Sequence, residues 1–102
     1  MEIRYYITED GKKPFTEWLD QLTDDKGRGN VLARINRLKL GNSGDCRSVG
    51  GGVWELRIDF GPGYRVYYAK SGNEIVLLLC GGNKKTQQAD IDKAKKFWAN
   101  YN

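Results

Sequence analysis

Four basic side chains in one stretch of the sequence are the residues most able to do chemistry: Arg57, Arg65, Lys84 and Lys85. Guanidinium and ammonium groups that converge on one point can bind a phosphodiester and stabilise the charge that develops on its oxygens during cleavage. Arginine suits stabilisation because it stays charged, whereas a lysine crowded by other cations can donate a proton to a leaving oxygen. The alternative interpretation is that all four are ordinary surface cations that form salt bridges with nearby carboxylates.

The residues that are missing remove several other kinds of active site. The sequence contains no histidine, so a Ser-His or Cys-His nucleophile and histidine acid-base catalysis are excluded. The sequence also contains only two cysteines, so a zinc site is improbable, and we expect neither a metal nor a cofactor. The carboxylates Glu55 and Asp59 alternate with arginines, which favours cross-strand ion pairs over a glycosidase-like pair. RNA fits the residues that remain, because its 2′-hydroxyl supplies the nucleophile.

The four cations sit at the ends of three expected strands. Val53 to Phe60 and Tyr64 to Lys70 are rich in β-branched and aromatic residues, and Gly61-Pro62-Gly63 between them predicts a tight turn. The third strand, Glu74 to Cys80, is apolar on both faces, which is typical of a central strand. Antiparallel pairing brings the residues after this strand, Gly81 to Lys85, beside the turn. We therefore expect the four cations to converge at one end of the sheet.

The length of the turn decides which side chains of the hairpin share a face. A three-residue loop would place Asp59 opposite Arg65 and Arg57 opposite Tyr67, with both arginines on the polar face. A loop of two or four residues would move the two arginines onto opposite faces. The three-residue loop is favoured because the apolar residues that alternate with the charged ones need a core.

Three helices are expected around these strands. The first begins at Pro14 and ends near Leu22, with an apolar stripe at helical spacing. Asp24 or Asp25 can cap the second helix, and Thr86 can cap the last. The expected apolar faces consist of Phe15, Trp18, Leu19 and Leu22 in the first helix, Val31, Leu32, Ile35 and Leu38 in the second, and Ile91, Ala94, Phe97, Trp98 and Tyr101 in the last.

Two further strands, Glu2 to Thr8 and Asp45 to Val49, complete the chain. The expected order is β-α-α-β-β-β-β-α in a single domain, residues 1–102. This order predicts an α+β fold in which a small antiparallel sheet is covered by an N-terminal helical hairpin and a C-terminal helix. A chain of 102 residues has room for one modest core.

The charge of the chain is unevenly spread. Residues 1–25 hold seven acidic and three basic side chains, a net charge of −4, whereas residues 26–102 hold six acidic and 14 basic ones, a net charge of +8. The basic part suits an anionic partner, with nucleic acid the first candidate. The alternative is a basic surface that has no partner. No apolar run is long enough to span a membrane, and no signal-peptide pattern is present. Cys46 and Cys80 are expected to be free thiols in the cytoplasm.

Two long runs of the sequence resemble the RelE/ParE toxin superfamily. They are ELRIDFGPGYRVYY (Glu55 to Tyr68) and IVLLLCGGNKKTQQADI (Ile75 to Ile91). The upstream segments FTEWLDQL (Phe15 to Leu22) and RLKLGNSGD (Arg37 to Asp45) are similar to the HigB-like branch, whose members are described as phage-derived or addiction-module killer proteins. The resemblance covers nearly the whole chain, and the combination GPGYR…GGNKKTQ is its most specific part.

The resemblance implies a RelE-like fold and the toxin of a type II toxin–antitoxin pair in the bacterial cytoplasm. Relatives of the RelE and HigB kind are ribosome-dependent mRNA endonucleases, which cleave mRNA in the ribosomal A site without a metal and leave a cyclic phosphate. The implied partners are the ribosome with its mRNA and a helix-turn-helix antitoxin. Operator DNA would be reached only through the antitoxin, and no membrane is involved.

The resemblance also implies roles for single residues. The arginine of the superfamily's GYR motif falls on Arg65, a basic residue of the preceding strand falls on Arg57, and the basic residue after the last core strand falls on Lys84. We therefore expect these three to be catalytic. The residues assigned to RNA binding are Lys85, Tyr67 and Arg47.

The sequence departs from the superfamily at two points. Some relatives carry a lysine near the position of Glu55, and some use a late tyrosine or histidine that has no clear counterpart here, since Tyr101 is expected in the core. The general acid and base therefore stay unassigned.

Two other functions are compatible with this resemblance. A ParE-like toxin would inhibit DNA gyrase without cleaving RNA, and the fold alone does not distinguish it from a nuclease. An inactive partner would act only as a regulator through the antitoxin. The basic cluster favours the endonuclease.

Overall fold

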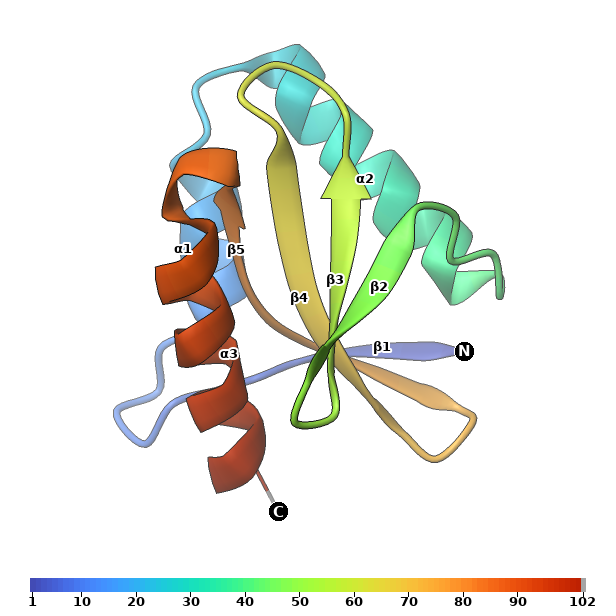
Figure 1. The fold of residues 1–102 in the computed structure, drawn as a ribbon, viewed down its shortest axis with the longest axis vertical. Coiled ribbons are helices and arrows are strands. Elements are labelled where there is room, and N and C mark those ends of the chain that lie inside the picture. The colour runs from blue at the N-terminus through green and yellow to red at the C-terminus, as the bar shows by residue number, and fades with distance from the viewer. Residues whose placement is uncertain (102) are drawn as a thin grey trace.

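Five strands in one sheet, with helices on both sides, make up the computed structural model, which describes residues 1–101 (Figure 1). The elements in chain order are β1 (Glu2–Tyr5), α1 (Pro14–Asp20), α2 (Asp25–Lys39), β2 (Cys46–Gly50), β3 (Val53–Ile58), β4 (Tyr64–Ser71), β5 (Ile75–Asn83), the 3₁₀ turn η1 (Lys84–Thr86) and α3 (Gln87–Asn100). Across the sheet the strands follow the order β1-β5-β4-β3-β2. The α+β class and the element order predicted from the sequence are confirmed.

Each face of the sheet buries its own apolar cluster under helices. On one face α1 and α2 pack on alternate residues of β3, β4 and β5; the cluster includes Phe15, Val31, Leu38, Leu56, Val66 and Leu78. On the other face α3 packs on the intervening residues; this cluster includes Val53, Tyr67, Leu77, Leu79, Ile91 and Ala94. Figure 1 shows α3 in front of the sheet and α1 behind it. The strand that reads as apolar on both faces, β5, therefore lies between two layers of helix, as predicted.

The sheet is mixed rather than wholly antiparallel, because β1 runs parallel to β5. Glu2 lies opposite Ile75 and Tyr5 lies opposite Leu78, and the pairing continues where the Tyr6 amide donates to the Leu78 carbonyl at 2.9 Å. The pairs β2–β3, β3–β4 and β4–β5 are antiparallel, as expected. The direction of β1 could not be deduced from its own residues, since a strand shows the same alternation in both directions.

The local signals that begin and end α2 act largely as predicted. Asp24 is the N-cap, and its carboxylate accepts a hydrogen bond from the Lys26 amide at 3.1 Å. Gly41, with a φ of +92°, closes the other end and donates its amide to the Leu38 carbonyl at 3.0 Å. The prediction for Leu32 is wrong, because this side chain is turned about 100° from its buried neighbour and is exposed.

The helical hairpin packs closely on the sheet. α1 ends at Asp20, earlier than expected, yet Leu22 still contacts the core from the segment that follows. At Gly27 in the first turn of α2, an added Cβ would lie 2.6 Å from a ring carbon of Tyr64. A glycine here therefore lets the helix approach the first residue of β4.

Candidate anion-binding site

The β3–β4 hairpin places Arg57 and Arg65 directly opposite each other on neighbouring strands. A loop of five residues, 59–63, joins the strands, and within it the Gly63 amide donates to the Phe60 carbonyl at 3.1 Å. The predicted three-residue loop is therefore wrong, as is the pairing of Asp59 with Arg65. Because three and five are both odd, the two arginines still lie on one face of the sheet, as predicted.

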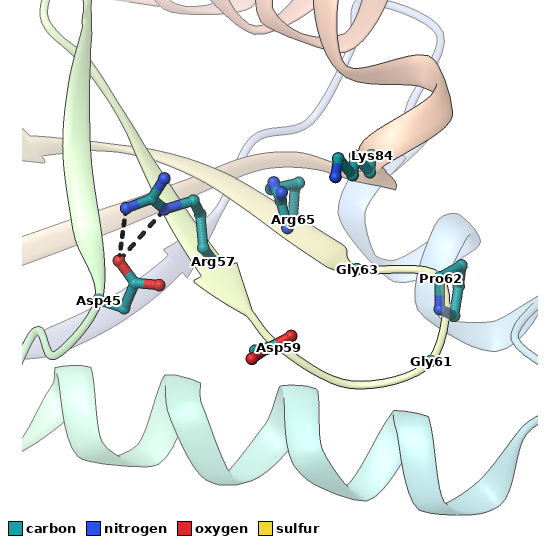
Figure 2. A pocket seen from close by; sticks show the side chains of 8 residues that line it. All are labelled: Asp45, Arg57, Asp59, Gly61, Pro62, Gly63, Arg65 and Lys84. Carbon is teal, nitrogen blue, oxygen red and sulfur yellow. Dashed lines mark hydrogen bonds and ion pairs between the residues drawn. The ribbon is translucent and has the colours of Figure 1, made fainter.

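A hollow of about 430 Å³ collects Arg57, Arg65 and Lys84 at this end of the sheet (Figure 2). Its other lining residues are Asp45, Asp59, Gly61, Pro62 and Gly63. The three cations come from β3, β4 and η1, so their meeting depends on the register of the sheet and not on closeness in the sequence. The predicted convergence of these three side chains is confirmed.

Lys85 lies beside this hollow. A neighbouring hollow of about 550 Å³ is lined by Pro62, Asn83, Lys84 and Lys85. The turn that carries both lysines is fixed by Asn83, whose Oδ1 accepts from the amides of Lys85 and Thr86 at 2.9 and 3.2 Å. Thr86 is the N-cap residue of α3, as predicted, but the capping hydrogen bonds come from Asn83 one turn earlier.

Gly63 lies beside both Arg65 and Lys84. Its φ of +77° lies in the left-handed region, which glycine adopts without strain. A Cβ at this position would lie 3.4 Å from Nη1 of Arg65 and 3.4 Å from Cβ of Lys84. The backbone conformation therefore favours glycine here, and a larger residue would contact both cations.

Arg57 is held by the carboxylate of Asp45, the residue directly before the edge strand β2. Its Nη2 and Nε donate to Oδ1 of Asp45 at 2.8 and 3.2 Å (Figure 2). These hydrogen bonds raise the pKa of Arg57 above its ordinary value. The pair is open to water, with 40% of the Arg57 side chain and 53% of the Asp45 side chain exposed. Exposed pairs contribute little to stability, so an incoming phosphate can replace the carboxylate.

Arg34 of α2 braces the backbone that carries this pair. Its Nη1 donates to the Arg57 carbonyl at 2.5 Å, and its Nη2 donates to the carbonyls of Ser43 and Asp45 at 3.2 Å each. Burial lowers the pKa of Arg34 below its ordinary value. Sequence reasoning missed this residue, because in the sequence it resembles any other basic residue of the helix surface.

Arg65 is the most enclosed of the three cations, with 12% of its side chain exposed. Nη1 donates to the Tyr64 carbonyl at 3.2 Å, whereas the buried Nε has no hydrogen-bond partner within residues 1–101. The carboxylate that pairs with it is Glu55, whose Oε1 lies 4.0 Å from Nε. Because Nε is buried, the donors of Arg65 that a bound anion can use are those on its two Nη atoms.

Glu55 is completely buried, which the sequence did not indicate. Its Oε1 accepts from Nε of Arg47 at 2.9 Å, and its Oε2 accepts from the Tyr67 hydroxyl at 2.9 Å and the Gln87 amide at 2.8 Å. Burial by itself raises the pKa of Glu55, but these hydrogen bonds outweigh it and hold that pKa below its ordinary value. The predicted cross-strand ion pair is confirmed for Glu55, with Arg47 as the partner.

Tyr67 is wrongly placed for the RNA contact predicted for it. The side chain is fully buried under α3 and lies opposite Glu55 rather than Arg57. Burial, with the neighbouring Glu55 carboxylate, raises the pKa of Tyr67. Arg47 differs, because half of its side chain is exposed on the edge strand β2.

The other titratable groups singled out in the sequence lie away from this hollow. Cys46 and Cys80 are free thiols, as predicted, and burial raises the pKa of Cys80 to about 12, which keeps it protonated at neutral pH. Across the described residues, no three His, Cys, Asp or Glu side chains are grouped to hold a metal ion. In the same residues, no helix has the length and apolar character needed to cross a membrane.

The fold and the hollow define a small α+β domain with three cations at one end of its sheet. A family model described as "Phage derived protein Gp49-like (DUF891)" matches residues 17–99, so this chain belongs to that family, whose toxins are of the RelE/HigB type. The matched segment contains all three cations of the hollow. An uncharacterized protein of Haemophilus influenzae strain Rd is 49% identical over 81 residues, which cover 79% of this chain and 82% of the relative.

Proposed function

We propose that this protein is the toxin of a type II toxin–antitoxin pair, of the HigB-like branch, and that it cleaves mRNA on the ribosome. The observation that carries the proposal is the convergence of Arg57, Arg65 and Lys84 on one hollow. Like charges directly opposite each other on neighbouring strands repel, and an anion bound between the two arginines relieves that repulsion. A phosphodiester of RNA supplies such an anion.

The proposed reaction uses the RNA's own nucleophile. The 2′-oxygen attacks the adjacent phosphorus, the bond from phosphorus to the 5′-oxygen breaks, and a 2′,3′-cyclic phosphate and a 5′-hydroxyl are formed. Arg57 and Arg65 bind the non-bridging oxygens and stabilise the charge that grows on them. Lys84 donates a proton to the leaving 5′-oxygen. The hollow contains two carboxylates, Asp59 and Asp45, and the phosphate displaces Asp45 from Arg57, so both are candidates for the base that takes the 2′-hydroxyl proton.

The remaining RNA contacts and the partners follow from the same proposal. Lys85, which lines the neighbouring hollow, and the exposed part of Arg47 on the edge strand β2 would contact the RNA strand beyond the cleaved phosphodiester. The cognate antitoxin is a helix-turn-helix protein through which the toxin reaches operator DNA. An acidic or apolar antitoxin segment would neutralise the cationic end or brace the helical hairpin.

Brief expression in a bacterial host, followed by mapping of new RNA 5′ ends on translated transcripts, tests the proposal. The variants are Arg65→Ala and a matched control, Lys96→Ala, which removes an equal charge from the exposed surface of α3. We expect 5′-hydroxyl ends within codons for the wild type and the control, and about 100-fold fewer for Arg65→Ala, the usual effect of losing one transition-state donor.

Two results would overturn the proposal. Growth arrest with intact mRNA and inhibited gyrase would assign the ParE-like function instead. Growth without arrest, from a protein shown to be folded, would assign a purely regulatory role.

A further inference from the structure

Behind the cationic hollow lies a buried carboxylate that does not line it. We infer that Glu55 is a positioning residue, which fixes the relative places of the elements that carry Arg57, Arg65 and Lys84. With no exposed surface, Glu55 cannot touch an RNA strand and must act through its neighbours. The inference rests on the proposed function for the reaction that is measured, but the arrangement itself can be tested without substrate.

The sheet register makes Glu55 the neighbour of both arginines. Arg57 lies opposite Arg65, and one step along the same face of the sheet Glu55 lies opposite Tyr67. On its other side Glu55 lies opposite Arg47 of β2. The carboxylate is therefore in the row of side chains directly behind the row that forms the floor of the hollow.

The hydrogen bonds to Glu55 come from three different elements. Arg47 donates from β2 and the Tyr67 hydroxyl donates from β4. The third donor, Gln87, is the first residue of α3 and directly follows the turn Lys84–Thr86. One carboxylate is therefore hydrogen-bonded to β2, to β4 and to the residue that follows the turn with Lys84.

The electrostatics of this group suit positioning better than stability. Taking a carboxylate and its partners out of water is costly, and an apolar side chain at a buried position often stabilises a fold equally well. What a fully hydrogen-bonded buried network adds is a single fixed geometry. Oε1 also lies 4.0 Å from Nε of Arg65, so the carboxylate attracts that guanidinium while Arg47 forms the hydrogen bond.

The negative charge of Glu55 gives the inference a distinctive kinetic signature. Glu55→Gln removes the negative charge beside Arg47 and Arg65, so the attraction of the site for RNA phosphate should not weaken. Misplacement of the cations should instead slow the chemical step, because a shift of about 1 Å can cost up to about 100-fold in rate. A positioning role therefore predicts a fall in kcat with KM unchanged or lowered.

The test compares Glu55→Gln and Gln87→Ala with Gln88→Ala in ribosome-dependent cleavage. Gln88 is the matched control, because it is adjacent in α3 and its side-chain amide donates to exposed Asp92, at 3.0 Å, and not to Glu55. We expect kcat to fall about 10- to 100-fold in Glu55→Gln and about 3- to 10-fold in Gln87→Ala, with KM no higher and Gln88→Ala unchanged. A KM that rises as kcat falls, in step with a lowered Tm, would mean that Glu55 only supports the fold and would overturn the inference.

Amide hydrogen exchange in the turn provides a readout that needs no activity. The amides of Lys85 and Thr86, which donate to Asn83, should exchange about tenfold faster in Gln87→Ala and not in Gln88→Ala. Unchanged exchange would refute the positioning role whatever the kinetics. If the wild type cleaves no RNA but Gln87→Ala still exchanges these amides faster than the wild type, the proposed function is wrong and the positioning role of Glu55 stands.

Discussion

Replacing Gly63 by alanine tests whether the β3–β4 loop leaves space for a phosphate beside the cations. A left-handed φ, +77° at Gly63, costs a residue with a Cβ about 1–2 kcal/mol. Gly72 in the β4–β5 turn has a φ of +65°, and a Cβ there would meet no atom of residues 1–101 within 4 Å, so Gly72→Ala measures that conformational cost alone. At Gly63 the new Cβ would also contact Nη1 of Arg65 and Cβ of Lys84, each 3.4 Å away, and so take up space that a phosphate bound by these two cations needs.

Thermal unfolding and a titration with inorganic phosphate separate these two effects. A loss of about 1–2 kcal/mol lowers Tm by roughly 4–16 °C in a domain of this size, and we expect it in both variants. Phosphate affinity should fall about tenfold in Gly63→Ala alone, which corresponds to one charge-assisted hydrogen bond of about 1.5 kcal/mol. Equal phosphate affinity in the two variants would refute the reasoning that Gly63 leaves space for the phosphate.

Four further predictions concern separate features. Asp45→Asn releases Arg57 from its exposed partner and should tighten inorganic phosphate binding about two- to threefold in calorimetric titration, whereas weaker binding would contradict this account. In urea unfolding, Gly29→Ala in α2 should raise the free energy of unfolding by about 0.5–1 kcal/mol, because alanine favours a helix interior and a Cβ there would meet no atom of residues 1–101 within 4 Å. Gly82→Ala should instead leave the chain largely unfolded, because its Cβ would overlap the Asp90 carboxylate. The pKa of Glu55 is lower in the folded chain, so its contribution to stability is present above about pH 4.3 and is lost as the pH falls through the folded-state value. The wild type should therefore lose more stability than Glu55→Gln between about pH 7 and about pH 3, and parallel curves would show that folding does not lower the pKa of Glu55.

The element order was predictable because each element carries local signals. Pro14, Asp24 and the glycine-containing turns mark where helices and strands begin and end, and the apolar spacing distinguishes one type from the other. The common face of Arg57 and Arg65 was also predictable, since it depends only on whether the loop length is odd. The actual length, five residues, was not, because the turn residues alone allow several registers.

The support behind the cations could not be predicted. Glu55 and Gln87 are 32 positions apart, and Arg34 reaches backbone 23 positions away, so neither contact leaves a local pattern. Tyr67 was wrongly assigned because alternation gives the face on which a side chain lies and not the helix that later covers that face. The fold thus follows from local chemistry, whereas the support of the site follows from contacts made after folding.

The parallel pairing of β1 with β5 governs when a newly made chain can fold. A ribosome makes the chain from its N-terminus, yet β1 and β4 both pair with Ile75–Asn83, which is made after them. Until those residues emerge, both apolar clusters lack the strand that lies between them, and such long-range pairings form late. Lys84 and Gln87 emerge later still. A toxin proposed to act on ribosomes therefore has no assembled site until the segment that carries Lys84 has been made.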